Sequence, residues 1–400
     1  MLDVTADAVI QRLRSAVEGN LPDYLADLER LVNIECGTYN KAGVDQVGRW
    51  VAAQLRELGA EVTIEPHDTL GATVVGVLEG SGARNALLIG HLDTVFPDGT
   101  VAERPFVIED GRAYGPGVDD MKGGLLGGLY ALRALRGLSL GSSGKADWLP
   151  YRRLVFIANP DEEIGSPSST PIIRHHARDA DLALVLESAR ENGDIVSARK
   201  GISEFTLRIT GRAAHAGVEP EKGRSATLEA AHKAVAIAAL NGRWPGVTVN
   251  VGVIRGGTRA NVVAEKCEME IDMRAVTRSD MEEAAAAIRG ICQESTVPDV
   301  TCALERRHHW LPMEKTPGTA ALAELAIDLA ARMDFELRDA ATGGASDANT
   351  TSGLGVPTLD GLGPIGGADH APGEYLEVDS IVPRTTLVAA LLLSAAEPLR

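Results

Sequence analysis

The stretch ALLIGHLDTV, residues 86–95, places a histidine and a carboxylate at the end of a short apolar run. Alternate side chains of an extended chain share a face, so we expect His91 and Asp93 to point into one site. A neighbouring carboxylate holds an imidazole ring and makes its other nitrogen a better metal ligand. A lone pair of this kind is more often an ordinary hydrogen-bonded pair. The pattern nevertheless indicates a buried strand that ends at a metal site.

Other short apolar runs accompany this one, at residues 61–65, 73–78, 154–158 and 182–186. Several are continuously apolar, which is typical of strands in a sheet covered on both faces. Leucine and valine recur at helical spacing between and around them. We therefore predict an α/β fold, with a three-layer αβα catalytic domain built on a mostly parallel sheet.

The middle of the chain has a different pattern, in which apolar and polar residues alternate as in half-buried strands. Two alanine-rich helices, at 225–240 and 279–293, separate these strands. The resulting order β-α-β-β-α-β is that of a ferredoxin-like unit. We expect an inserted α+β domain at 200–311, which would serve as a lid and dimerisation domain, within a discontinuous catalytic domain at 1–199 and 312–400.

Composition limits the possible partners. The chain has 400 residues and a formal net charge of -17, which argues against a surface for nucleic acid or anionic membranes. The four cysteines lack metal-binding spacing, and the first twenty residues lack the features of a signal peptide. We expect a cytoplasmic enzyme with small-molecule substrates, and neither nucleic acid nor membrane as a partner.

Further acidic and histidine residues follow predicted strands or turns. They are Asp119, Asp120, Glu162, Glu163, Glu187, Asp369 and His370. Each of these motifs by itself has an ordinary structural explanation, because acidic runs are usually solvated loops and an Asp pair can cap a helix. In α/β sheets, however, sites gather at the carboxyl ends of strands. Two histidines with several carboxylates suit zinc or a related divalent ion.

Several segments resemble, in order, the signatures of the zinc-dependent aminoacylase and carboxypeptidase metallopeptidase family. They are GHLDTV (90–95), AYGPGVDDMKGG (113–124), NPDEEIGS (159–166), LVLES (184–188), AAHAG (213–217) and GGADHAPGEY (366–375). Within the family the chain is most similar to the bacterial glutamate carboxypeptidases, through LERLVNIECGT (28–38) and GGASDA (343–348).

The resemblance implies two zinc ions per subunit, with cobalt or manganese as possible substitutes. It assigns His91, Asp120 and Glu187 to one ion, and Asp120, Glu163 and His370 to the other. Asp120 would bridge the ions, and its spacing to Lys122 favours it over Asp119. Asp93 would orient His91, and Glu162 would be the general base.

The resemblance also implies roles for residues outside the strand ends. His215 would stabilise the oxyanion, in its own subunit or across a homodimer formed through the inserted domain. Asn261 and Arg274 would bind substrate, and Gly343 and Gly344 would let the backbone approach it. Without the resemblance, a turn histidine with a local hydrogen bond is the preferred interpretation of His215. Asn261 and the two glycines then fit ordinary turns, and Arg274 a surface ion pair, equally well.

Together these features predict a di-zinc metallohydrolase that releases a C-terminal amino acid, with glutamate as the first choice, from N-acyl or peptidyl substrates. An aminoacylase or a dipeptidase on the same site is the alternative. A catalytically silent binding protein with this fold is an alternative of another class. A two-carboxylate glycosidase would leave both histidines unexplained.

Overall fold

The computed structural model of the chain describes residues 7–138 and 148–397. Contacts divide the chain into two compact units. The first unit comprises the chain up to Ser197, Lys315–Ala341, and the chain from Ser346 onward. The second comprises Ala198–Glu314 and the short return Thr342–Ala345.

The first unit is built on a six-stranded sheet with the order β1-β2-β6-β3-β7-β14. Its strands are β1 (Glu61–Glu65), β2 (Thr73–Glu79), β3 (Asn85–His91), β6 (Arg153–Asn159), β7 (Leu182–Val185) and β14 (Thr358–Leu359). The pairings from β6 through β3 and β7 to β14 are parallel, whereas β2 joins β1 and β6 in antiparallel pairings. All seven residues of β3 are buried, as expected for a strand covered on both faces.

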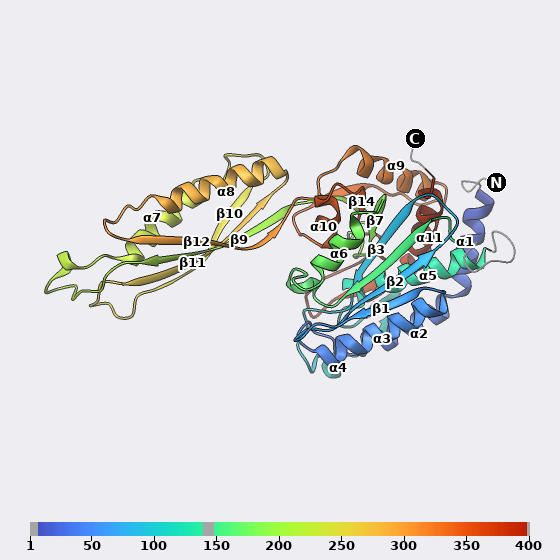
Figure 1. The fold of residues 1–400 in the computed structure, drawn as a ribbon. Coiled ribbons are helices and arrows are strands. Elements are labelled where there is room, and N and C mark those ends of the chain that lie inside the picture. Colours follow the sequence, from blue (N-terminus) through green and yellow to red (C-terminus); the bar gives the residue numbers. More distant parts are fainter. Residues whose placement is uncertain (1–6, 139–147, 398–400) are drawn as a thin grey trace. The chain divides into compact units, whose positions relative to one another are not determined.

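Helices cover both faces of this sheet (Figure 1). The helices in contact with one another or with the sheet are α1 (Asp7–Gly19), α2 (Leu21–Val32), α3 (Lys41–Glu57), α5 (Gly124–Gly137), α6 (Thr170–Ala177), α9 (Pro317–Ala331), α10 (Asp347–Gly353) and α11 (Val378–Ser394). In Figure 1, α6 and α10 lie on one side of the sheet, and α5 and α11 on the other. The predicted three-layer α/β architecture is confirmed.

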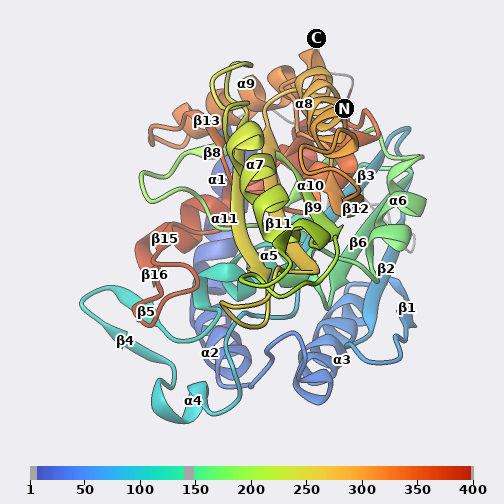
Figure 2. The same cartoon turned by 90° about the vertical axis from the view of Figure 1, so that its left-hand side faces the viewer.

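The second unit contains a four-stranded antiparallel sheet with the order β10-β11-β9-β12. Its elements are β9 (Gly201–Thr210), α7 (Ala226–Ala238), β10 (Thr248–Gly256), β11 (Lys266–Ala275), α8 (Arg278–Gln293) and β12 (Thr301–Trp310). Figures 1 and 2 show α7 and α8 side by side over one face of the sheet. The alternating residues Phe205, Leu207 and Ile209 are buried there. The ferredoxin-like α+β unit is thus present as predicted.

The remaining elements are short and lie mostly around the sheet edges of the first unit. They are α4 (Thr100–Glu103), β4 (Val107–Glu109), β5 (Arg112–Tyr114), β8 (Ile195–Arg199), β13 (Asp339–Thr342), β15 (Gly366–Gly367), β16 (Tyr375–Glu377), a π-helical turn at Val118–Gly123, and 3-10 turns at Glu162–Ile164 and Pro220–Lys222. Strands β15, β16, β5 and β4 pair in that order as a small antiparallel sheet.

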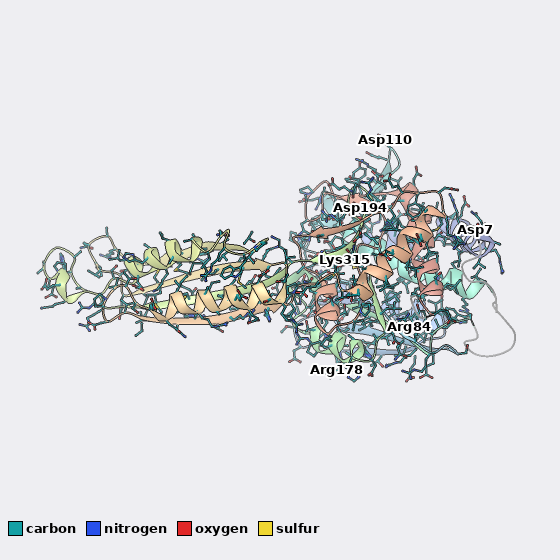
Figure 3. The ribbon with its side chains drawn as sticks, turned by 90° about the horizontal axis from the view of Figure 1, so that it is seen from above. Asp7, Arg84, Asp110, Arg178, Asp194 and Lys315 are labelled. Carbon is teal, nitrogen blue, oxygen red and sulfur yellow. The ribbon has the colours of Figure 1, made fainter. Side chains whose placement is uncertain are left out.

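Charged side chains lie on the outside of the first unit, among them Asp7, Arg84 and Arg178 (Figure 3). Arg84 also joins two parts of the fold, because its Nη1 donates to the carbonyl of Ala395 at 2.7 Å. None of the helices in the described ranges combines the length and apolar composition that crossing a bilayer requires.

Helix α5 approaches the end of β7 very closely at Gly124. A Cβ atom at this position would lie 1.7 Å from the carbonyl oxygen of Leu186, the residue before Glu187. The approach holds the chain that carries Glu187 against the first turn of α5. Only a residue without a side chain fits this contact.

We expect Gly124→Ala to lower the free energy of unfolding by about 1–3 kcal/mol, because the new methyl group forces backbone apart. Gly137→Ala, at the other end of α5, is the matched control. Nothing lies within 4 Å of a Cβ at Gly137, so that substitution should be neutral or stabilising. Urea unfolding measures both, and equal midpoints for the two variants would contradict the close approach.

Candidate metal centre

The ends of three adjacent parallel strands bring the predicted strand-end residues together. Strand β3 ends at His91, β6 leads into the turn that carries Glu162 and Glu163, and Glu187 follows β7. Because β6, β3 and β7 are neighbours in the sheet, their carboxyl ends meet at one edge. This is the local reason that distant parts of the sequence share one site.

Asp120 lies between two histidines. Its Oδ1 is 3.0 Å from Nε2 of His91, and its Oδ2 is 3.0 Å from Nε2 of His370. Glu187 Oε2 lies 3.7 Å from the same nitrogen of His91, and Glu163 Oε2 lies 3.1 Å from that of His370. One carboxylate thus faces both halves of the cluster, as a bridging ligand does.

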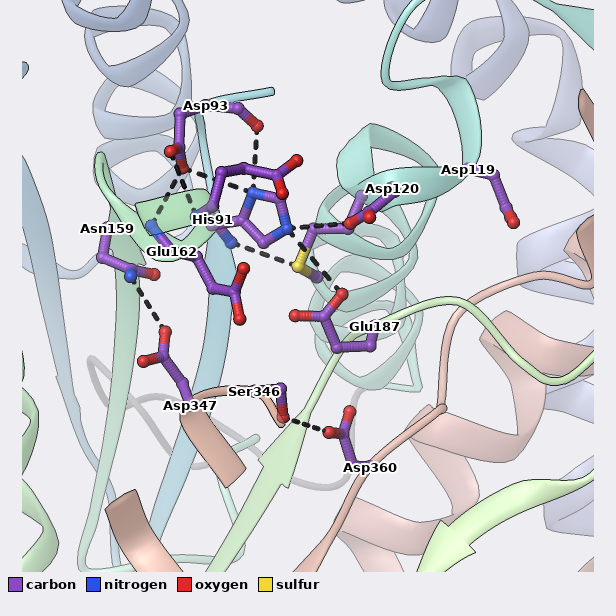
Figure 4. Close-up of polar contacts among 12 residues, drawn as sticks. His91, Asp93, Asp119, Asp120, Asn159, Glu162, Glu187, Ser346, Asp347 and Asp360 are labelled. Atoms are coloured by element: carbon purple, nitrogen blue, oxygen red, sulfur yellow. Dashed lines mark hydrogen bonds and ion pairs between the residues drawn. The ribbon is translucent and has the colours of Figure 1, made fainter. Parts of the chain in front are cut away.

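Asp119 is directed away from this cluster. Figure 4 shows its side chain turned from the imidazole of His91, whereas Asp120 faces it. Asp119 is 1% exposed, and neither of its oxygens has a hydrogen-bond partner among the described residues. Burial raises the pKa of Asp119 well above its ordinary value, and Asp369 adds to this rise. Of the adjacent aspartates, Asp120 therefore has the geometry of a shared ligand.

Asp93 contacts His91 through its backbone more closely than through its side chain. The carbonyl of Asp93 lies 3.0 Å from Nδ1 of His91, and the nearest carboxylate oxygen lies 3.4 Å away. The carboxylate accepts the hydroxyl of Thr38 at 2.7 Å and the amide of Glu162 at 3.2 Å. Asp93 therefore positions both the imidazole ring and the turn that carries the adjacent glutamates.

The carboxylates of the cluster have strongly altered acidity. Burial raises the pKa of Glu187 to about 8, although His91 partly opposes this. Burial, with Glu187 adding to it, also raises the pKa of Glu162 well above its ordinary value. At Asp120 burial acts in the same direction, but hydrogen bonds from His370 and His91 outweigh it and hold the pKa below its usual range.

The two histidines respond to the same excess of negative charge. Hydrogen bonds to Asp120 and Glu163 raise the pKa of His370 to about 10. Burial opposes a charge on His91, yet Glu187 and Asp120 raise its pKa well above the ordinary value. The raised pKa values of both histidines reflect an excess of nearby carboxylates, and such a site attracts cations.

The donor atoms fit divalent metal ions. His91, Glu162 and Glu187 offer atoms within 4.8 Å of one another, and so do His91, Asp120 and Glu163. One oxygen of Glu163, Oε1, is buried without a hydrogen-bond partner among the described residues. Imidazole and carboxylate donors of this kind suit zinc and similar ions. Glu162 and Glu163 both lie near His91. Glu163 differs from Glu162 in its contact with His370.

The other candidate residues lie in the second unit. They are His215, Asn261, Arg274, Gly343 and Gly344. The segments of His215 and Asn261 are neighbours, because the amide of Ala216 donates to the carbonyl of Asn261 at 3.0 Å. Arg274 donates from Nη1 to the carbonyl of Gly343 at 2.9 Å, and its Nε to Asp272 at 3.2 Å. The structure thus places the segment of His215 beside Asn261, and Arg274 beside Gly343, while the carbonyl of Gly344 accepts from Nη1 of Arg199 at 3.3 Å.

Sequence reasoning missed Glu374, which is 1% exposed. Its Oε1 accepts the amides of Asp119 and Asp120 at 2.9 and 3.0 Å, and its Oε2 accepts that of Gly117 at 2.9 Å. Burial raises its pKa to about 7, although these amides lower it. Glu374 therefore fixes the turn that presents Asp120. The only signal in the sequence for a role of Glu374 was its position four residues after His370, because an isolated glutamate in a loop forms no periodic pattern.

A second buried network supports the turn after β6, and it too was missed. Asn159 donates from Nδ2 to Asp347 at 2.8 Å (Figure 4), and Ser166 donates its hydroxyl to the same carboxylate at 2.6 Å. Burial raises the pKa of Asp347 to about 7. The network joins the end of β6 to the start of α10.

Comparison with known proteins places this geometry in context. The model of a family described as "Peptidase family M20/M25/M40" matches residues 87–394. The chain is 30% identical to carboxypeptidase G2 of Pseudomonas sp. (strain RS-16), over 95% of this chain and 91% of that protein. It is 27% identical to acetylornithine deacetylase of Edwardsiella ictaluri, over 93% and 97% of the two chains. Among solved structures it resembles aminopeptidase PepT of Bacillus cereus, with a TM-score of 0.76 and 25% identity over 94% and 99% of the two chains.

We expect Glu374→Gln to weaken divalent-ion binding about 10- to 100-fold, because an amide group cannot accept all three backbone amides that hold the Asp120 turn. Competition with a chelator measures the affinity without relying on turnover. Glu377→Gln is the matched control, since Glu377 is a half-exposed carboxylate paired with Arg112. Equal affinities of the two variants would show that Glu374 does not position Asp120.

Proposed function

Because the chain belongs to peptidase family M20/M25/M40 and is therefore a metal-dependent hydrolase, we propose that it is a di-zinc enzyme that cleaves an amide bond to release a C-terminal amino acid. The proposed substrates are N-acyl amino acids or short peptides, with glutamate as the preferred released residue. The name of the relative carboxypeptidase G2 supports the carboxypeptidase type of reaction.

One observation carries this proposal. The carboxylate of Asp120 lies 3.0 Å from both His91 and His370, with Glu187 and Glu163 beside the respective histidines. A carboxylate shared in this way suits two ions held close together. We propose His91, Asp120 and Glu187 as ligands of one ion, and Asp120, Glu163 and His370 as ligands of the other.

Glu162 is proposed as the general base. Two divalent ions, when bound, polarise the scissile carbonyl and acidify the attacking water. Glu162 takes the proton of that water and returns it to the leaving amine. Its backbone amide donates to Asp93 at 3.2 Å, so the residue that positions His91 also positions the base.

The second unit supplies the remaining proposed roles. His215 donates a hydrogen bond to the oxyanion, which is usually a large catalytic contribution. Arg274 binds the free carboxylate of the substrate, a task that suits its planar guanidinium group. Asn261, Gly343 and Gly344 complete the proposed substrate contacts through side-chain or backbone groups.

We further propose that the protein is a homodimer formed through the second unit. On α7, Leu228 and Val235 lie seven residues apart on one helix face and are 50% and 74% exposed. At the edge of the sheet, Ile254 of β10 is 50% exposed. An apolar helix face beside an open sheet edge is typical of a surface that another chain covers. A cytoplasmic location is also proposed, and the four cysteines, all free, agree with it.

A substrate panel tests the proposed reaction. Zinc-loaded protein should release glutamate from N-acyl-glutamate faster than it releases aromatic residues from N-acyl-aromatic amino acids or cleaves plain dipeptides, and removing the metal should abolish release. Initial rates measured by amine release decide between the reactions. Preference for another class would establish an aminoacylase or dipeptidase. No hydrolysis of any member would favour the silent binding protein.

We expect Glu162→Gln to retain the metal stoichiometry and to lose turnover by at least about 100-fold, since a neutral amide cannot take the proton. Metal analysis and kcat on the same preparation give both readouts, and full activity would contradict the role of Glu162 as general base.

His215→Ala should also keep its metal and lose turnover. If His215 acts across the dimer, mixed dimers of the two variants should recover part of the activity.

A further inference from the structure

A pocket of 470 Å³ in the first unit adjoins the candidate metal centre. It is formed by residues 37–40, by the segment 94–98 that follows β3, and by residues 163–164. Its size falls within the range of about 300–1,000 Å³ typical of small-molecule sites. None of the residues proposed above for substrate binding lines it.

The accessible side chains in this pocket are largely apolar. Tyr39 is 79% exposed, Val95 40% and Ile164 36%, and these three residues come from three separate segments of the chain. Large apolar side chains scattered singly on a surface need no explanation, but their convergence on one concavity indicates a binding surface. Phe96 contributes a further, mostly buried ring.

The charged residues of the pocket disfavour an anionic occupant. Asp98 and Glu163 are acidic, and the described residues that line the pocket include no lysine or arginine. Asn40 donates to Asp98 at 2.7 Å and leaves its negative charge in place. Arg104 lies over the ring of Phe96 at 4.8 Å, but it is not a lining residue and donates to the carbonyl of Pro372 at 2.7 Å. An apolar group without negative charge is therefore the occupant that this lining favours.

The pocket and the metal centre share Glu163. Its Oε2 lies 3.1 Å from His370, while its chain neighbour Ile164 forms part of the pocket wall. Thr38, another lining residue, donates to Asp93 at 2.7 Å. A substrate whose carbonyl lies beside Glu162 and Glu163 can thus extend its acyl side into the pocket, away from the amino acid that is released.

From this arrangement we propose that the pocket receives the acyl group of the substrate and selects aromatic or bulky aliphatic acyl groups over acetyl. The inference rests on the proposed amidohydrolase function and names the acyl half of its substrate. Tyr39, Val95 and Ile164 are the residues that determine the selectivity, because they offer the apolar contact area that an acetyl group is too small to use.

The test compares N-benzoyl and N-acetyl derivatives of the amino acid that the panel identifies. The wild-type protein should have the larger kcat/KM for the benzoyl compound. Tyr39→Ala and Ile164→Ala should lower the benzoyl-to-acetyl ratio of kcat/KM about tenfold or more, and Tyr39→Phe should preserve it. Ile108→Ala is the matched control, because Ile108 is 46% exposed in the same unit and does not line the pocket.

The outcomes separate the two proposals. An unchanged ratio in active Tyr39→Ala and Ile164→Ala variants would overturn the acyl pocket and leave the amidohydrolase function standing. If no compound is hydrolysed, the proposed amidohydrolase function is wrong. Calorimetric binding of N-benzoyl and N-acetyl amino acids to metal-loaded protein then tests the proposed acyl pocket by itself. Tighter binding of the benzoyl compound that is lost in Tyr39→Ala supports it, and equal affinities overturn it.

Discussion

The contact of one carboxylate, that of Asp120, with two imidazoles is the constraint on which the rest of the first unit depends. His91 is the last residue of a fully buried strand, whereas His370 lies in a loop with a side chain that is 55% exposed. Holding Asp120 between them requires a turn of fixed shape, and Glu374 supplies it by accepting the backbone amides of Gly117, Asp119 and Asp120. Burying several carboxylates together costs free energy unless cations balance their negative charge. The raised pKa values of Glu162 and Glu187 reflect this cost of burial.

Much of this arrangement was predictable from sequence, because it follows from strand order. The apolar runs before His91 and Glu187 are continuous, and parallel strands bring their ends together regardless of distance along the chain. The ferredoxin-like unit was predictable for a related reason, since alternating residues such as Met269, Ile271 and Met273 show one buried face. The periodicity of apolar residues therefore predicted the fold, and the resemblance to a known family supplied the roles of the site residues.

What could not be predicted depends on isolated polar residues in loops. Nothing in the spacing of Glu374 or Asp347 shows that their carboxylates are buried against backbone amides or an asparagine. The resemblance favoured Asp120 over Asp119, but the physical basis of that choice lies in backbone angles within one turn, where Asp120 has a φ of -107° and a ψ of 95°. The closer contact of His91 with the carbonyl of Asp93, compared with its carboxylate, is likewise a matter of a few tenths of an ångström. Such details arise from tertiary packing, which leaves no repeating pattern in the sequence.

The loop that contains His370 and Glu374 lies near the end of the chain, yet it completes a site whose other members were synthesised long before. His370 supplies one donor directly, and Glu374 shapes the turn that presents Asp120, which precedes it by 254 residues. A ribosome-bound chain that has emerged only as far as β14 has the sheet strands with His91 and Glu187 but neither of these two contributions. The cluster is therefore complete only after the last part of the chain has been synthesised.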